Sequence, residues 1–145
     1  MRDAFGGTFM FKIIIIFIVF YVTFMAIAAN YAKVFKIKNN VINILEQSQF
    51  NYNDANDWNG IVNNGKISTY LSSVAYNHKD NDNIVNDCRN RAGQLSSNGV
   101  CIRGESLGKS SAYYEVTVYM VVSFPLFSID FVIPISGETE TVNFQ

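Results

Sequence analysis

The two cysteines, Cys88 and Cys101, are the residues whose type and spacing point most directly to covalent chemistry. The twelve residues between them exclude a Cys-x-x-Cys redox motif, and two sulfur atoms alone do not complete a zinc site. An even cysteine count at short spacing is typical of one local disulfide in an oxidising compartment. We therefore expect a structural Cys88–Cys101 bond, which stabilises a domain by about 3 kcal/mol in the chain-entropy model.

Residues suited to metal binding or acid–base catalysis are few. His78 is the only histidine, and neither a second imidazole nor a cysteine lies at ligand spacing, so we expect it in a surface loop. The stretches 53–57 and 80–83 offer carboxylate and amide oxygens that a calcium ion would accept. Neither stretch has the glycine and the final glutamate of an EF-hand loop. Solvated turns explain both stretches, with calcium binding as the alternative, and we expect no metal ligands.

The segment 104–111 has glycine, lysine and serine in the order of a phosphate-binding loop. Only three residues separate Gly104 from Gly108, whereas the Walker pattern requires four and a following helix. The chain also lacks a nucleophile elbow and an evident pair of catalytic carboxylates. We therefore expect no catalytic residues, no cofactor and no small-molecule substrate.

The elements that hold these residues begin with an apolar N-terminal segment. Residues 13–29 carry no charge, and residues 8–11 extend the apolar run beyond Lys12. About 20 residues at 1.5 Å each cross a hydrocarbon core of about 30 Å. Lys12 lies close enough to the edge for its ammonium group to reach the headgroups. We therefore predict a transmembrane helix in the lipid bilayer over residues 8–30, after a short cytoplasmic leader at residues 1–7.

A cleavable secretory signal is the alternative for this segment. Such a signal has an apolar region of about 7 to 15 residues and a small-x-small cleavage site, which Ala26-Ile27-Ala28 imitates. The longer apolar run and the continuing helical pattern favour an uncleaved anchor. Basic residues flank both ends of the segment, so the positive-inside rule leaves the orientation open. The expected disulfide favours a single-pass protein of the cell membrane with its C-terminal domain outside the cytoplasm.

Helical periodicity continues beyond the expected membrane edge. Apolar residues recur at steps of three and four from Val34 to Leu45, and neither glycine nor proline interrupts residues 8–48. We predict one helix of about 40 residues, in which residues 31–48 form an amphipathic continuation. This continuation packs against an extracytoplasmic α+β domain at residues 49–145.

The polar middle of the chain is predicted to be mostly irregular. Residues 49–65 are rich in asparagine, aspartate and glycine, which favour turns, so we expect a loop with one helical turn near Trp58. Apolar residues at helical spacing predict a short helix over residues 66–76. Residues 77–87 are predicted to be another polar connection.

The C-terminal third changes to strand periodicity. Residues 113–124 alternate with period two and are rich in β-branched and aromatic residues, which predicts a long strand. Shorter strands are expected at residues 99–103, 131–135 and 139–144, with Pro125 and Pro134 at strand ends or edges. The predicted fold class is therefore α+β, with the long helix covering the apolar face of an antiparallel sheet of three or four strands.

The overall charge places one limit on partners. The formal net charge is −1 and the sequence pI is about 5.7, so the chain has no overall basic field that would attract nucleic acid. We therefore expect no nucleic-acid partner.

This layout resembles the pilin-like proteins of Gram-positive bacteria, in particular the tight-adherence (TadE-like) minor pilins. The resemblance spans the chain in layout and is carried by three stretches: Met1–Gly7 with its glycine pair, Lys36–Gln47, and Ile135–Thr141. It implies a pilin-like fold and a subunit of, or accessory to, a type IV or Tad pilus or a related secretion assembly. The implied partners are other pilin-like subunits or a secretion platform.

Lys12 departs from the pattern of this family. In such proteins a peptidase cuts after a glycine, and the fifth mature residue is usually a glutamate that pairs with a neighbour's amino terminus. The matching cut lies between Gly7 and Thr8 and would place Lys12 at the fifth position. Either cleavage does not occur or the chain is not a standard major subunit. We expect a non-enzymatic minor subunit, and the alternative is a membrane-anchored extracellular binding module that does not polymerise.

Overall fold

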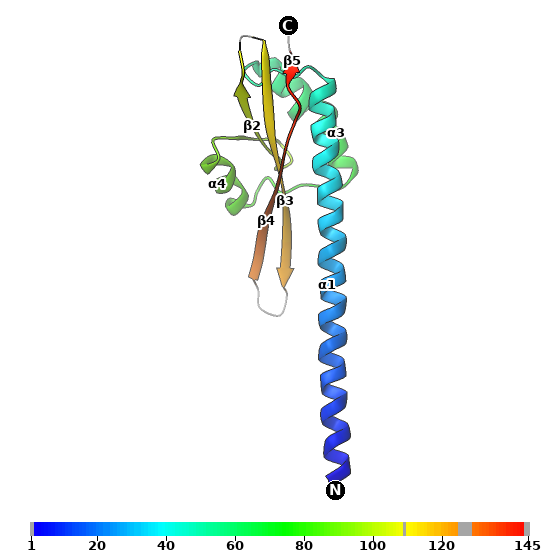
Figure 1. Cartoon of the computed structure of the whole chain (residues 1–145). Helices are drawn as coiled ribbons and strands as arrows, with labels where there is room; N and C mark the ends of the chain where they lie inside the picture. The colour runs from blue at the N-terminus through cyan, green and yellow to red at the C-terminus, as the bar shows by residue number, and fades with distance from the viewer. Residues whose placement is uncertain (1, 109, 125–128, 144–145) are drawn as a thin grey trace. The chain divides into compact units, whose positions relative to one another are not determined.

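The computed structural model describes residues 2–108, 110–124 and 129–143 (Figure 1). Its helices are α1 (Arg2–Gln47), α2 (Ala55–Asp57), the π-helix η1 (Trp58–Asn63), α3 (Lys66–Ser73) and α4 (Asp82–Asn90). Its strands are β1 (Gln94–Leu95), β2 (Cys101–Ser106), β3 (Ser111–Phe124), β4 (Ile129–Glu138) and β5 (Val142–Asn143). The chain divides into two compact units, Met1–Lys33 and Val34–Gln145, and each is described by itself. The α+β class predicted from the sequence is confirmed.

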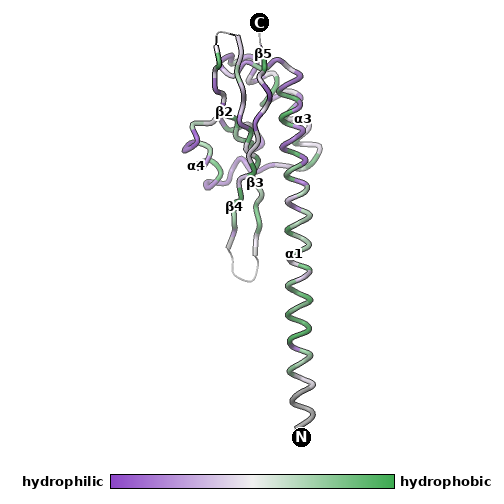
Figure 2. Tube along the Cα trace, in the orientation of Figure 1, coloured by the Kyte–Doolittle hydropathy of each residue, from purple (hydrophilic) through white to green (hydrophobic). Residues whose placement is uncertain are grey.

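The long helix predicted over residues 8–48 is confirmed as α1, although it starts earlier than expected. The described residues of the expected leader, 2–7, already belong to the helix. An unbroken helix suits an apolar environment, because it satisfies its backbone hydrogen bonds internally. Beyond its grey first turns, the N-terminal half of α1 is predominantly hydrophobic in Figure 2.

The second unit begins where α1 presents an apolar stripe to the sheet. The buried residues of this stripe follow helical spacing: Val34, Ile37, Val41 and Leu45. Gly137 of β4 lies against the side chains of Lys38 and Ile42, where an added Cβ would approach Ile42 Cδ1 to 3.0 Å. The C-terminal part of α1 therefore covers one face of the sheet, as predicted (Figure 1).

The sheet is antiparallel with the order β1-β2-β3-β4, and β5 pairs with the first residues of β3. It has five strands, more than the three or four predicted, because short β1 was not expected. Strand β5 lies within the predicted strand at residues 139–144. Pro134 lies inside β4, which pairs only with β3, so its predicted place on an edge strand is confirmed. Pro125 lies outside the described residues.

The middle of strand β3, from Val116 to Met120, is buried on both faces of the sheet. On one face, Tyr114 packs on Phe50 with ring centroids 5.2 Å apart. On the other face, Tyr119 joins a buried cluster with Ile84, Cys88 and Cys101. The even positions of β3 are therefore apolar along the strand, whereas only Thr117 and Tyr119 are buried among the odd positions.

The prediction that residues 77–87 form only a polar connection is wrong. Helix α4 occupies Asp82–Asn90, and Asn81 caps it by accepting hydrogen bonds from the backbone N–H groups of Asn83 and Ile84 at 3.1 and 3.4 Å. Ile84 and Cys88 lie four residues apart and are both buried. A stripe of two residues among polar neighbours is too weak to show as helical periodicity.

The loop predicted for residues 49–65 is likewise more helical than expected. It contains α2 and η1, and Asp54 caps α2 by accepting a 2.8 Å hydrogen bond from the backbone N–H of Asn56. Trp58 and Val62 are buried one helical turn apart. Aromatic and aliphatic burial therefore orders a segment whose composition favours turns.

Candidate functional site

The N-terminal part of α1 exposes an apolar surface that no element of its own unit covers. Phe17 and Phe20 are 72% and 75% exposed, and the most apolar stretch within residues 7–47 has no buried residue. Removing one large apolar side chain from water stabilises a protein by about 1.5–3 kcal/mol. Summed over the apolar side chains of this helix, the free energy gained by removing them from water exceeds the free energy of unfolding of an ordinary domain, about 5–15 kcal/mol. The helix is long and apolar enough to span a membrane.

The residues of the proposed cleavage site lie on this helix. Gly7 is exposed, and apart from its chain neighbours and the adjacent helix backbone no atom of the described chain lies within 4 Å of the position that a Cβ would take there. Thr8 and Lys12 are also exposed. The structure therefore places Gly7, Thr8 and Lys12 on one accessible helical segment, and cleavage after Gly7 stays a prediction.

The expected bond between Cys88 and Cys101 is present, with an S–S distance of 2.01 Å. It links α4 to the first residue of β2, and both cysteines are buried. Gly93 lies directly against it, since an added Cβ would come within 2.4 Å of Cys101 Sγ. The disulfide therefore acts as a core element that holds α4 on the sheet.

The Tyr76 hydroxyl bridges the point where β2 and β3 separate. Extending the register that pairs Cys101 with Thr117 would place Gly99 opposite Tyr119, beyond the end of β2. Tyr76 Oη accepts a 3.0 Å hydrogen bond from the Tyr119 N–H, and the carbonyls of Gly99 and Tyr119 lie 3.3 and 3.4 Å away as acceptors. Burial raises the pKa of Tyr76.

The direction of these hydrogen bonds also explains why β4 tolerates a proline at position 134. Because the Tyr119 N–H and C=O both point toward Tyr76, Tyr119 and Pro134 form a pair without mutual backbone hydrogen bonds. The N–H that proline lacks is therefore not needed on the β3 side.

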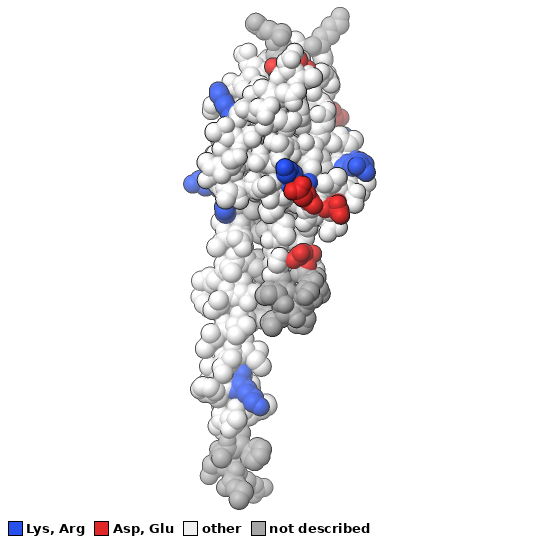
Figure 3. Space-filling model, turned by 180° about the vertical axis from the view of Figure 1, so that it is seen from behind, with Lys and Arg blue, Asp and Glu red and all other residues white. Residues whose placement is uncertain are grey.

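Alternating charges cross one face of the sheet. Arg91 Nε donates to Asp87 Oδ2 at 2.8 Å and Arg91 Nη1 lies 3.6 Å from Glu115 Oε1. Arg103 lies 3.9 Å from Glu115 and 3.6 Å from Glu105. These side chains are between 26% and 53% exposed, so each pair contributes little to stability. Figure 3 shows charges of both signs on the domain and few on the helix toward its N-terminus.

Tyr119 is a buried residue whose hydroxyl reaches these charged side chains. Its hydroxyl donates a 3.0 Å hydrogen bond to Asp87 Oδ2, which also accepts from Arg91. Burial, together with this hydrogen bond to a carboxylate, raises the pKa of Tyr119. The contact positions α4 on the sheet beside the disulfide.

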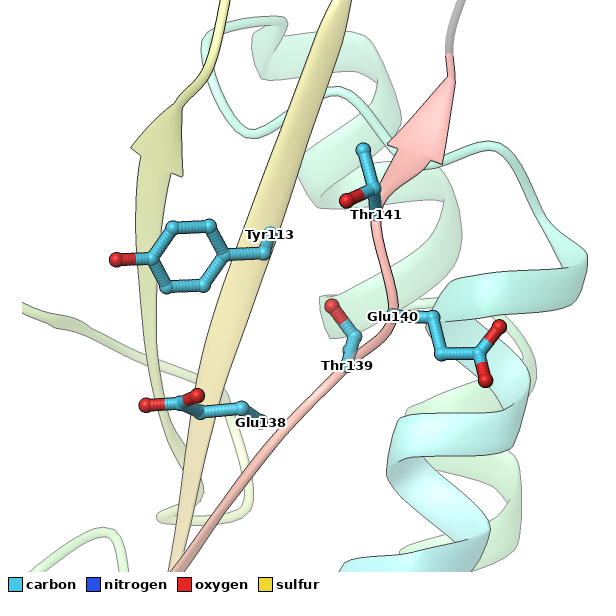
Figure 4. A pocket seen from close by; sticks show the side chains of 5 residues that line it. All are labelled: Tyr113, Glu138, Thr139, Glu140 and Thr141. Atoms are coloured by element: carbon cyan, nitrogen blue, oxygen red, sulfur yellow. The ribbon is translucent and has the colours of Figure 1, made fainter.

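An open depression of about 550 Å³ lies where β4 gives way to β5 (Figure 4). It is lined by Tyr113, Glu138, Thr139, Glu140 and Thr141. Glu138 and Glu140 point to opposite sides of the chain in Figure 4. The backbone N–H of Glu140 donates to Glu46 Oε1 at 2.8 Å, and the Tyr114 N–H donates to Thr139 Oγ1 at 2.9 Å. The Glu140 backbone and the Thr139 hydroxyl therefore hold this segment against α1 and β3.

The residues considered for metal binding serve other purposes. Asp54 and Asn81 use their side-chain oxygens as helix caps. His78 packs edge-on against the Tyr76 ring at 4.8 Å between centroids. Among the described residues, no three histidine, cysteine or acidic side chains are grouped for a metal ion.

Sequence reasoning missed Tyr76, Asp87 and Lys38. Lys38 lies between the apolar positions of the helical pattern, yet it is only 8% exposed, and its Nζ lies 4.3 Å from the centroid of the Phe35 ring. Gly137 makes this burial feasible because it leaves room for the lysine stem. A glycine in a predicted strand is a known sign of close approach by another element, and it could have indicated this contact.

Comparison with known proteins finds no family model, no curated protein and no solved structure that matches the chain.

Proposed function

We propose that this chain is a non-enzymatic, pilin-like subunit anchored in the cell membrane, a minor component of a surface filament or a related secretion assembly. The observation that carries the proposal is α1, a single helix of 46 residues with two environments. Its N-terminal part exposes apolar side chains, and its C-terminal part is built into a small β-domain. One continuous helix therefore belongs both to the proposed membrane anchor and to the β-domain.

The disulfide supports the orientation of the proposed subunit. A buried Cys88–Cys101 bond forms and persists in an oxidising compartment. The domain then lies outside the cytoplasm, and residues 1–7 lie inside.

Lys12 supports a minor rather than a self-assembling role. If cleavage follows Gly7, the new amino terminus at Thr8 lies four residues from Lys12, on the same helix face. Two positive charges about 6 Å apart repel by roughly 3 kcal/mol at an effective dielectric constant of about 20. Packing many such helices together would add the cost of placing each lysine in apolar surroundings. Homopolymers through this end are therefore disfavoured unless a partner supplies an acid.

The test is electron microscopy of cells that express this chain as their only pilin-like subunit, with mass spectrometry of the mature amino terminus. The wild-type chain should form few or no filaments. If the chain begins at Thr8, Lys12→Glu should increase self-association, because the carboxylate can pair with a neighbour's amino terminus. Lys33→Glu is the matched control, since it makes the same charge change at another exposed position of α1. Abundant filaments with an unmodified Lys12 would refute the proposed role.

Lys12 also favours a second function, a membrane-anchored binding module that never polymerises. That function predicts an uncleaved chain beginning at Met1 and no effect of Lys12→Glu on self-association. The same mass spectra and micrographs therefore separate the two functions.

A further inference from the structure

Lys38 is a cationic side chain that is buried without a carboxylate beside it. Only 8% of the residue is exposed, and its Nζ lies 4.3 Å from the centroid of the Phe35 ring. No ion pair or hydrogen bond among the described residues includes its ammonium group. A ring face balances part of the charge but offers no oxygen to the three ammonium donors. Because buried charges in proteins are normally paired, this position favours an anionic partner from outside the chain.

The ammonium group of Lys38 is nevertheless reachable from solvent. Every fully buried side-chain nitrogen or oxygen among the described residues has a hydrogen-bond partner. The Lys38 ammonium has none, so its Nζ must reach the surface although the stem is buried. The stem lies on Gly137 of β4, where an added Cβ would come within 3.0 Å of Lys38 Cδ and 2.9 Å of its Nζ. Packing therefore holds the ammonium group in place beside Gly137.

The outer edge of β4 carries unpaired backbone groups next to this ammonium group. Strand β4 pairs only with β3, and Pro134 faces Tyr119 there in a pair without mutual hydrogen bonds. Two and four residues further along the strand, Ser136 and Glu138 therefore also direct their N–H and C=O groups away from β3. Both residues are exposed. These backbone groups lie on either side of Gly137, the residue that the lysine stem covers.

This stretch of free edge is short and is bounded on both sides. At one end, Pro134 has no N–H group to offer an added strand. At the other end, the N–H of Glu140 already donates to Glu46 Oε1 at 2.8 Å. Between these two limits, the outward N–H groups of Ser136 and Glu138 remain for a partner. The edge therefore suits one short extended segment rather than a long strand or a sheet.

We propose that this edge binds an extended peptide segment of a partner protein, which adds to β4 as a further strand and gives one carboxylate to Lys38. Main-chain hydrogen bonds to Ser136 and Glu138 hold the segment, and the ion pair selects an acidic one. A side chain of the added strand on the same face as Gly137 points toward the ammonium group. The Glu138 side chain lies on the opposite face, so it does not compete for the lysine. All these residues belong to the second unit, and the proposal does not depend on the membrane anchor.

The test is fluorescence anisotropy of labelled peptides titrated with the full chain in non-ionic detergent micelles. The acidic probe is a short threonine–valine peptide with one central glutamate and an amidated C-terminus, and its matched control has glutamine in that place. A third peptide combines the glutamine with a free C-terminal carboxylate, which separates the two sources of the acid. A fourth is the acidic probe with N-methylated backbone amides, which cannot complete a strand ladder. Lys38→Met removes the charge and keeps an unbranched stem, and Lys36→Met is the control at an exposed position of α1.

The parent chain should bind a peptide with a carboxylate, from the glutamate or from the free C-terminus, at least about ten-fold more tightly than the amidated glutamine peptide. This comparison uses the parent chain alone, so it does not depend on how a variant folds. Lys38→Met should remove the preference and Lys36→Met should keep it, while N-methylation should weaken binding at least about ten-fold.

Four results would overturn the proposal. They are equal binding of the acidic and glutamine probes, no binding of any probe at about 1 mM chain, equal losses in the two lysine variants, and no effect of N-methylation. Self-association of the chain that competes with the acidic probe, measured by analytical ultracentrifugation, would assign the edge to a second copy and would also overturn the proposal.

Discussion

Removal of the Tyr76 hydroxyl tests the most specific contact of the β-domain. Tyr76 is only 4% exposed, and its hydroxyl is the bonding partner of the Tyr119 N–H at 3.0 Å. Tyr76→Phe keeps the ring and leaves this buried amide without its partner. An unsatisfied buried donor costs about 1–3 kcal/mol. We therefore expect the free energy of unfolding to fall by about 2 kcal/mol, which is more than a ten-fold change in the unfolding equilibrium.

The assay is urea unfolding of the full chain in non-ionic detergent micelles, followed by the fluorescence of Trp58, which is buried in the native domain. The midpoint should fall by about 1 M for a loss of this size. Tyr113→Phe is the matched control on the same strand, because the Tyr113 hydroxyl donates to Glu105 at an exposed site. This control should change stability by no more than about 0.5 kcal/mol. Equal midpoints for Tyr76→Phe and Tyr113→Phe would refute the bridging role of Tyr76.

Two further predictions concern the same core. Cys88→Ser should lower the free energy of unfolding by about 2–4 kcal/mol, measured in the same assay, while non-reducing mass spectrometry of the parent chain should show the mass deficit of one disulfide. Free thiols at both cysteines would contradict this. Burial raises the pKa of Tyr76 and Tyr119 in the folded state, whereas unfolded tyrosine titrates near about pH 10. Their contribution to stability is therefore fully present below about pH 10 and is lost as pH rises toward their folded-state values. Urea midpoints should fall between about pH 9 and pH 11, and less steeply in Tyr76→Phe; equal slopes in parent and variant would show that Tyr76 is not involved.

The long helix and the central strand could be predicted because each repeats one pattern over many residues. Residues 8–48 contain neither glycine nor proline, and residues 113–124 keep period two throughout. The disulfide could be predicted from the number of cysteines and their short spacing. Each of these signals is local or compositional, so one sequence suffices to detect it.

The rest of the fold depends on contacts between distant residues. Helix α4 has only Ile84 and Cys88 as buried anchors, and its start depends on the cap at Asn81. Tyr76 is hydrogen-bonded to Tyr119, which lies 43 positions later in the chain, and sequence periodicity does not reveal such a long-range contact. The burial of Lys38 depends on Gly137, almost a hundred residues later. Tertiary packing therefore decided the elements and contacts that local propensity left open.

The central claim is that α1 anchors the β-domain outside the cytoplasm. It is tested most directly with a reporter that is active only outside the cytoplasm, fused after Gln145 or before Met1, together with separation of membranes from soluble fractions. The account predicts an active C-terminal fusion that stays with the membrane and a silent N-terminal fusion. A silent C-terminal fusion with an active N-terminal one would contradict the orientation, and an active C-terminal fusion released from the membrane would contradict the anchor.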